Sequence, residues 1–161
     1  MKPSLTLVLL SCIALAGGCS TPRSLVVGQS TEADVRAQAG TPTGTWTDRD
    51  GNRVYEYATG PEGFITYLVR VGTDGKVREV TQVLTEDRLA KVVPGKTTKA
   101  EVRDLFGRPS FEHVYLVGPT WSWRFLFGGV RPGHIVVTFN PDDTVKDKIA
   151  IVDVTGEGRD K

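Results

Sequence analysis

The spacing of apolar residues changes along the chain in the same way twice. In each half, a short segment with helical spacing precedes segments in which apolar and polar residues alternate. The helical spacing predicts helices over 32–39 and 99–106, and a further short helix is predicted over 85–91. Alternation bounded by turn residues predicts eight strands, over 43–47, 52–58, 64–71, 76–84, 111–116, 120–127, 134–139 and 144–154.

The two helical segments are copies of one another. Residues 28–42 and 95–109 lie 67 positions apart and share seven of fifteen residues: Gly28/Gly95, Thr31/Thr98, Ala33/Ala100, Val35/Val102, Arg36/Arg103, Gly40/Gly107 and Pro42/Pro109. In each copy a Thr precedes the helix and an acidic residue follows three positions later, which predicts a capping box. The Gly and Pro pair predicts where each helix ends.

This repeat predicts the fold class. We expect an α+β protein of two tandem repeats, each a short helix pair packed on one face of a three- to four-stranded antiparallel sheet. The predicted organisation is a signal peptide over 1–18, a lipidated tether over 19–24, a first repeat over 25–84, a second repeat over 85–154 and a flexible tail over 155–161.

The N-terminus carries a targeting signal. Lys2 is followed by the apolar run Leu5–Leu15, which is too short to span a bilayer, and then by Ala16-Gly17-Gly18-Cys19. This ending resembles a bacterial lipobox, which implies that Cys19 becomes the acylated first residue. The alternative is an ordinary secretory signal cut near Gly18. Ser20, in place of Asp, resembles the sorting signal of lipoproteins sent to the outer membrane.

Composition and charge exclude several classes of function. Without Lys2 the remaining basic and acidic side chains balance, so a nucleic-acid or polybasic membrane surface is not expected.

Asp48, Asp50 and Asn52 imitate the start of a calcium loop, but its later ligands are absent, and a hairpin turn is expected. The sequence contains no motif for a catalytic site, metal site or cofactor site, so we expect a non-enzymatic protein without a cofactor or small-molecule substrate.

The strand positions that face solvent are the candidates for partner binding. Trp121 and Trp123 are expected in the core, and the predicted open sheet positions are Leu68, Arg70, Leu126, Val136 and Thr138. Hairpin-edge positions are also expected to be exposed. The predicted partner-binding residues are Trp46, His113, Tyr115, Leu126 and Val136.

The ordered motifs resemble a known family. Gly-x-x-Thr, a helix with Val, Gly-x-Pro and the strand Trp121-Ser122-Trp123 resemble the SmpA/OmlA family of BamE-like outer-membrane lipoproteins, as does Val137-Thr138-Phe139-Asn140 with the later Val145. The resemblance implies a periplasm-facing outer-membrane lipoprotein that binds envelope proteins, among them the barrel-assembly machinery, and assists outer-membrane protein assembly or envelope integrity. The chain departs from the family by one extra residue between Gly and Thr and by carrying two copies.

The tandem arrangement also resembles the β-lactamase inhibitor proteins. That likeness implies a second possibility, a binding module that docks on a periplasmic enzyme.

Overall fold

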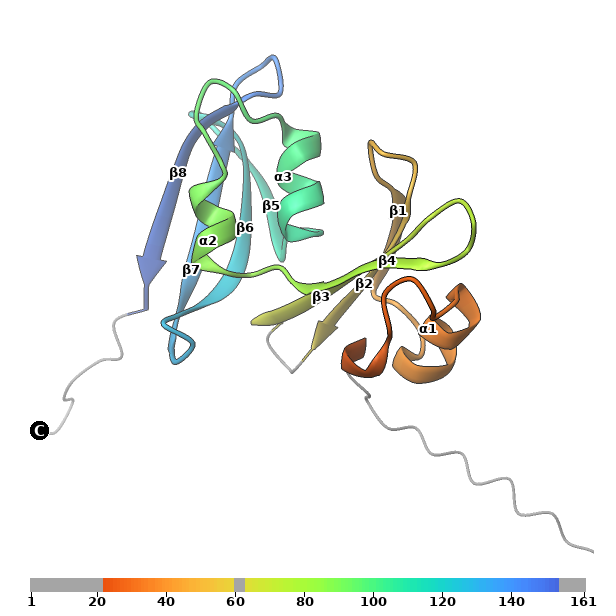
Figure 1. The fold of residues 1–161 in the computed structure, drawn as a ribbon. Coiled ribbons are helices and arrows are strands. Elements are labelled where there is room, and N and C mark those ends of the chain that lie inside the picture. The colour runs from red at the N-terminus through yellow and green to blue at the C-terminus, as the bar shows by residue number, and fades with distance from the viewer. Residues whose placement is uncertain (1–21, 60–62, 154–161) are drawn as a thin grey trace, which may run out of the picture.

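The computed structural model describes residues 22–59 and 63–153, which form two four-stranded antiparallel sheets with short helices (Figure 1). The predicted α+β class is confirmed. The first sheet has the order β1-β2-β3-β4, with strands Gly44–Thr47, Arg53–Thr59, Ile65–Val71 and Val77–Gln82. The second has the order β5-β6-β7-β8, with strands Phe111–Tyr115, Gly118–Phe127, Arg131–Phe139 and Val145–Val152. The helices are η1 (Pro22–Ser24), α1 (Glu32–Ala39), α2 (Glu86–Ala90) and α3 (Lys99–Phe106).

Both predicted capping boxes are present. The Thr31 hydroxyl accepts a hydrogen bond from the Asp34 backbone N–H at 3.3 Å, and the Thr31 N–H donates to the Asp34 carboxylate at 2.7 Å. Thr98 and Glu101 repeat this arrangement at 3.3 and 2.7 Å. These reciprocal bonds satisfy backbone donors that the first helical turn leaves free.

The glycine that begins each copy of the repeated sequence ties the segment before the helix to the last hairpin of the same repeat. The Gly28 N–H donates to the Val77 carbonyl at 2.8 Å, and the Gly95 N–H donates to the Val145 carbonyl at the same distance. In return, the Val77 N–H donates to Ser30, and the Val145 N–H donates to the Thr97 carbonyl. The repeated sequence is therefore a repeated three-dimensional unit, down to single backbone hydrogen bonds.

Two hydrophobic cores organise the molecule, and the first sheet borders both. One face of the first sheet packs on α1, in the core of Leu25, Val35, Tyr55, Tyr57, Tyr67, Val69, Val71 and Val77. Its other face contributes Val54 and Leu68 to the core that α3 shares with Trp121, Trp123 and Ile135 of the second sheet. In Figure 1, α3 accordingly lies between the two sheets.

This packing corrects the prediction for Leu68 and Arg70. Neither lies on an open face, because the second repeat covers this side of the first sheet: Leu68 is 0% exposed and the Arg70 side chain 13%. The core assignment of Trp121 and Trp123 is confirmed.

The two central strands of the second sheet, β6 and β7, are longer than predicted, whereas β5 and β8 are slightly shorter. β6 begins at Gly118, where the sequence predicts a turn, because Pro119 pairs with Val114 and Gly118 pairs with Tyr115. β7 begins at Arg131, three residues earlier than predicted, and Pro132 pairs with Leu126. Gly118 has a φ of +125°, a conformation that favours glycine and brings the chain into the ladder directly after a two-residue turn.

None of the helices within residues 22–59 and 63–153 combines the length and the apolar character that crossing a bilayer requires. The predicted signal peptide, Cys19 and the whole of the predicted tail lie outside the described residues.

Candidate partner-binding site

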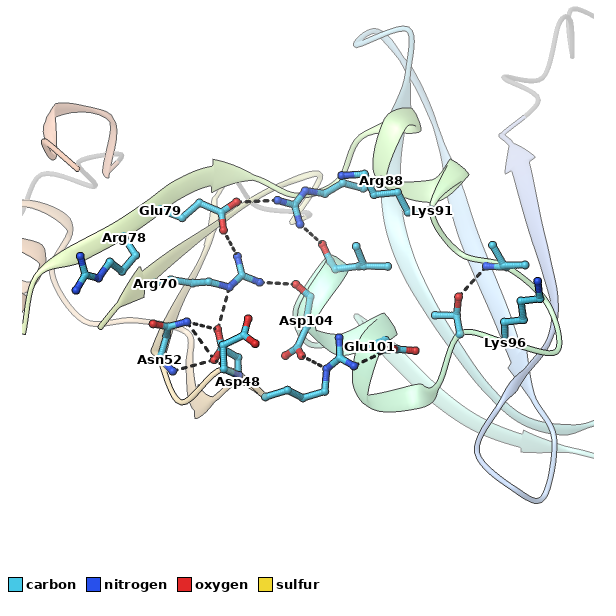
Figure 2. A pocket seen from close by; sticks show the side chains of 15 residues that line it. Asp48, Asn52, Arg70, Arg78, Glu79, Arg88, Lys91, Lys96, Glu101 and Asp104 are labelled. Atoms are coloured by element: carbon cyan, nitrogen blue, oxygen red, sulfur yellow. Dashed lines mark hydrogen bonds and ion pairs between the residues drawn. The ribbon is translucent and has the colours of Figure 1, made fainter. Parts of the chain in front are cut away.

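A polar groove of about 660 Å³ lies between the two repeats. Figure 2 shows its floor, where Arg70 donates to Asp48 at 3.2 Å, to Glu79 at 2.6 Å and to the Asp104 carbonyl at 2.6 Å. Arg88 joins the same network, donating to Glu79 at 3.0 Å and to the Leu105 carbonyl at 3.1 Å. Two guanidinium groups of the floor thus bind carbonyls near the C-terminal end of α3, where the helix dipole favours positive charge.

The charges on this floor neutralise one another. Glu79 bridges Arg70 and Arg88, and burial lowers the pKa of Arg88 while Glu79 opposes that shift. Arg49, on the β1–β2 turn, pairs with Glu101 at 2.7 Å and with Asp104 at 3.3 Å. These arginines are paired with residues of the same chain, and several of the pairs join the first repeat to α3 of the second. We call this network of Arg49, Arg70, Arg88 and their partners the clamp, because it fixes the two repeats relative to one another.

The Asp48–Asn52 segment belongs to this clamp. Asp48 Oδ1 accepts hydrogen bonds from the Asp50 N–H at 3.0 Å and the Asn52 N–H at 2.8 Å, which closes the β1–β2 turn. The predicted hairpin turn is confirmed. Among the residues that the structure describes, no group of three His, Cys, Asp or Glu side chains is arranged to hold a metal ion.

A second buried polar group lies where the two repeats meet, a region that we call the junction. Glu56 on β2 is 4% exposed, and burial raises the pKa of its carboxyl. The Arg108 N–H, 2.7 Å from Glu56 Oε1, and the positive charges of Arg108 and Arg103 oppose that shift. Gly44 and Gly107 approach this carboxylate so closely that a methyl group on either would meet its oxygens.

The side of the second sheet opposite α3 is a different kind of surface, which we call the outer face. Strand register places residues on it in rows across the sheet: Phe111, Ser122, Val136 and Ile149 in one row, and Arg124, His134 and Ile151 in the next. Phe111, Ile149 and Ile151 are about half exposed. This face therefore presents an apolar centre among polar side chains.

An aromatic ladder follows β5 along one border of the outer face. Phe111 and His113 stack with ring centroids 6.4 Å apart, and His113 and Tyr115 follow at 5.5 Å. All five β5 residues are exposed. Stacked rings of this kind present a large contact area at a small cost in conformational entropy.

Four of the five predicted partner-binding residues lie on this face. His113 and Tyr115 are exposed on β5, and Leu126 and Val136 are half-buried on β6 and β7. Trp46 lies at the junction instead, where Arg103 is 5.1 Å above its ring and its Nε1 donates to Asp104 at 3.4 Å.

Sequence reasoning missed Ile149 and Ile151, and the reason is a β-bulge. Val145 pairs with Phe139 but Asp147 pairs with Thr138, so Lys146 is an extra residue in β8. The extra residue reverses the side to which later residues point. Val145 is consequently buried while Ile149 and Ile151 are exposed, although all three are odd-numbered positions.

These observations define a class: a tandem α+β module whose second sheet has a helix-packed inner face and a largely exposed outer face. Residues 81–149 match the family model of the outer membrane protein assembly factor BamE domain. This match covers most of the second repeat, so the resemblance to the SmpA/OmlA family is confirmed for residues 81–149.

Other comparisons add little. No curated protein matches the chain. A solved DUF4309 family protein (YjgB) from Bacillus subtilis aligns at 16% identity over 81% of this chain and 84% of its own, with a TM-score of 0.32, which is too low to support an argument. Neither finding concerns the β-lactamase inhibitor proteins, so that resemblance stays a prediction.

Proposed function

We propose that this protein is a non-enzymatic lipoprotein that is anchored in the outer membrane through Cys19, faces the periplasm and binds a component of the outer-membrane protein assembly machinery. The observation that carries the proposal is the BamE-domain match over residues 81–149. The lipobox-like ending at Cys19 supports the anchor, which acylation would make stable.

The outer face is the proposed contact surface for that partner. His113, Tyr115, Leu126 and Val136 supply the predicted contacts, and Ile149 extends the apolar centre. Aromatic and apolar side chains at the centre of a patch, with polar residues around them, are the usual distribution of binding energy in a protein interface.

Affinity purification from detergent-solubilised envelopes tests the surface. The Ile149→Lys substitution places a charge at the centre of the outer face, and we expect it to abolish recovery of barrel-assembly subunits that the unsubstituted chain retains. The matched control is Val130→Lys, which changes an exposed apolar residue in the turn between β6 and β7. Equal recovery with both variants would contradict the assignment of the surface. Recovery of a soluble periplasmic enzyme instead would favour the inhibitor-like alternative.

Metabolic labelling with palmitate tests the anchor separately. We expect the label to be incorporated into the unsubstituted chain and lost in the Cys19→Ala variant, which should also leave the membrane fraction. Label that persists in Cys19→Ala would refute lipidation at this residue without affecting the surface assignment.

A further inference from the structure

The two sheets have four edge strands, and three of them carry features that discourage pairing. β1 has only four residues, β4 carries Arg78 and Glu79, and β8 carries Lys146, Asp147 and Lys148 directly after its first residue. Short length and charged side chains, lysine above all, are the usual protection of a sheet edge.

β5 has less of this protection, since Glu112 is its one acidic side chain. Its sequence is Phe-Glu-His-Val-Tyr, without Lys, Arg or Pro, and all five residues are exposed, with Val114 at 84%. In the sheet formed by the described residues, β5 has β6 as its only neighbour, so one backbone edge of β5 is free. An exposed edge strand without lysine, arginine or proline is a template for another strand.

The sequence of β5 is complementary to itself in the antiparallel direction. If a second β5 pairs about a twofold axis at His113, then Phe111 lies opposite Tyr115, Glu112 opposite Val114, and His113 opposite its own copy. Aromatic residues then meet aromatic residues, which is a favourable cross-strand pair, and no two carboxylates face each other. An axis at Glu112 would instead oppose two carboxylates, and an axis at Val114 would pair the strand with residues of the β5–β6 turn.

We propose that the free edge of β5 is a homodimerisation surface that binds the β5 of a second copy of this chain, antiparallel and centred on His113. The two second sheets become one continuous eight-stranded sheet. An axis perpendicular to the sheet keeps both outer faces on the same side, so the aromatic ladders of the two copies lie next to each other. The dimer thus doubles the outer face without covering its side chains.

Disulfide trapping in the full-length chain tests the register. Residues directly opposite in an antiparallel pair have Cα atoms about 4.5–5.5 Å apart, within the range a disulfide bridges. Mild oxidation with oxidised glutathione should therefore convert His113→Cys to a species of doubled mass on a non-reducing gel. The unsubstituted chain, with its own Cys12 and Cys19, supplies the background.

Two neighbouring positions are the matched controls. Glu112→Cys and Val114→Cys alone should each run at the mass of a single chain on the non-reducing gel, and the two proteins should cross-link to each other when they are mixed. Equal cross-linking of all three variants with themselves would indicate random collision and overturn the register.

Sedimentation in detergent tests the association without a cross-link. The unsubstituted chain should sediment as a dimer, and His113→Asp, which opposes two carboxylates, should sediment as a monomer with an unchanged circular dichroism spectrum. His134→Asp, the same change within the sheet on β7, should remain dimeric. A monomeric unsubstituted chain at millimolar concentration, or a His113→Cys cross-link to another protein only, would overturn the proposal.

Discussion

Gly40 and Gly107 occupy the same place in the two repeats. A comparison of the same substitution at both positions therefore measures how much the packing between the repeats contributes to the free energy of unfolding. Each ends its helix with a positive φ, +74° and +80°, and a nearly extended ψ, −146° and −161°. This region of conformational space is almost restricted to glycine. Their surroundings differ, because a Cβ at Gly40 would meet nothing within 4 Å, whereas a Cβ at Gly107 would overlap Glu56 Oε1 of the first repeat.

The free-energy cost of alanine at each position follows from these surroundings. A strained backbone conformation costs about 1–3 kcal/mol, and the loss of glycine's freedom in the unfolded chain returns about 0.4–1 kcal/mol, so Gly40→Ala should destabilise by about 1–2 kcal/mol. Gly107→Ala has the same backbone cost and must also displace the Glu56 carboxylate from the Arg108 N–H. A buried donor left without its partner costs about 1–3 kcal/mol more.

Urea denaturation followed by circular dichroism measures both variants. For a chain of this size each kcal/mol also lowers the Tm by about 2–4 °C, so thermal melting provides a second readout. Repeating both substitutions in a Glu56→Ala variant separates backbone strain from displacement of the Glu56 carboxylate. The free-energy costs of Glu56→Ala and Gly40→Ala should add, whereas Gly107→Ala should no longer cost more than Gly40→Ala. If Gly40→Ala and Gly107→Ala are equally destabilising, the reasoning about the junction is refuted.

Three further substitutions test other parts of the fold. Arg70→Met removes the central cation of the clamp and leaves the buried Asp48 carboxylate unpaired, so the free energy of unfolding in urea should fall by about 3–5 kcal/mol. Burial raises the pKa of Glu56, so its contribution to stability is complete below the unfolded pKa and is lost as the pH rises through the folded pKa; Glu56→Gln should abolish that part of the pH dependence of the Tm. Asp143 has a φ of +62°, where the first repeat has Gly75, and Asp143→Gly should stabilise the β7–β8 turn by up to about 1 kcal/mol in the same urea assay.

Local sequence signals predict which helices and strands form, but they predict the strand ends of the second sheet less accurately. The capping boxes and the hairpin at Asp48 are local features, and the structure contains them where the sequence places them. Strand ends are harder, because Pro119 and Pro132 lie in the ladder through pairing that only the neighbouring strands determine. The face of Ile149 depends on a bulge, which the alternation of apolar residues in β8 does not reveal.

The predicted open face failed in the first repeat for a different reason. Alternation identifies two faces of a strand but does not say what covers each, and Leu68 and Arg70 are covered by a helix of the other repeat. No property of β3 alone distinguishes this from exposure to solvent. In the second repeat, by contrast, the predicted open positions Leu126, Val136 and Thr138 do lie on the face opposite α3.

The comparison of the two copies nevertheless contains a signal for this junction. At the three positions where α1 has Ala37, Gln38 and Ala39, α3 has Asp104, Leu105 and Phe106. The Asp104 carboxylate accepts from Arg49, and the carbonyls of Asp104 and Leu105 accept from Arg70 and Arg88, while Phe106 packs on Trp123 at 5.3 Å.

The second helix thus differs from the first where it must contact two sheets rather than one. A helix that buries two sides leaves the first sheet with no free face, since α1 covers the other. Among the described residues, the outer face of the second sheet then remains the largely exposed strand surface. This is the physical reason for our proposal that the partner binds the second repeat.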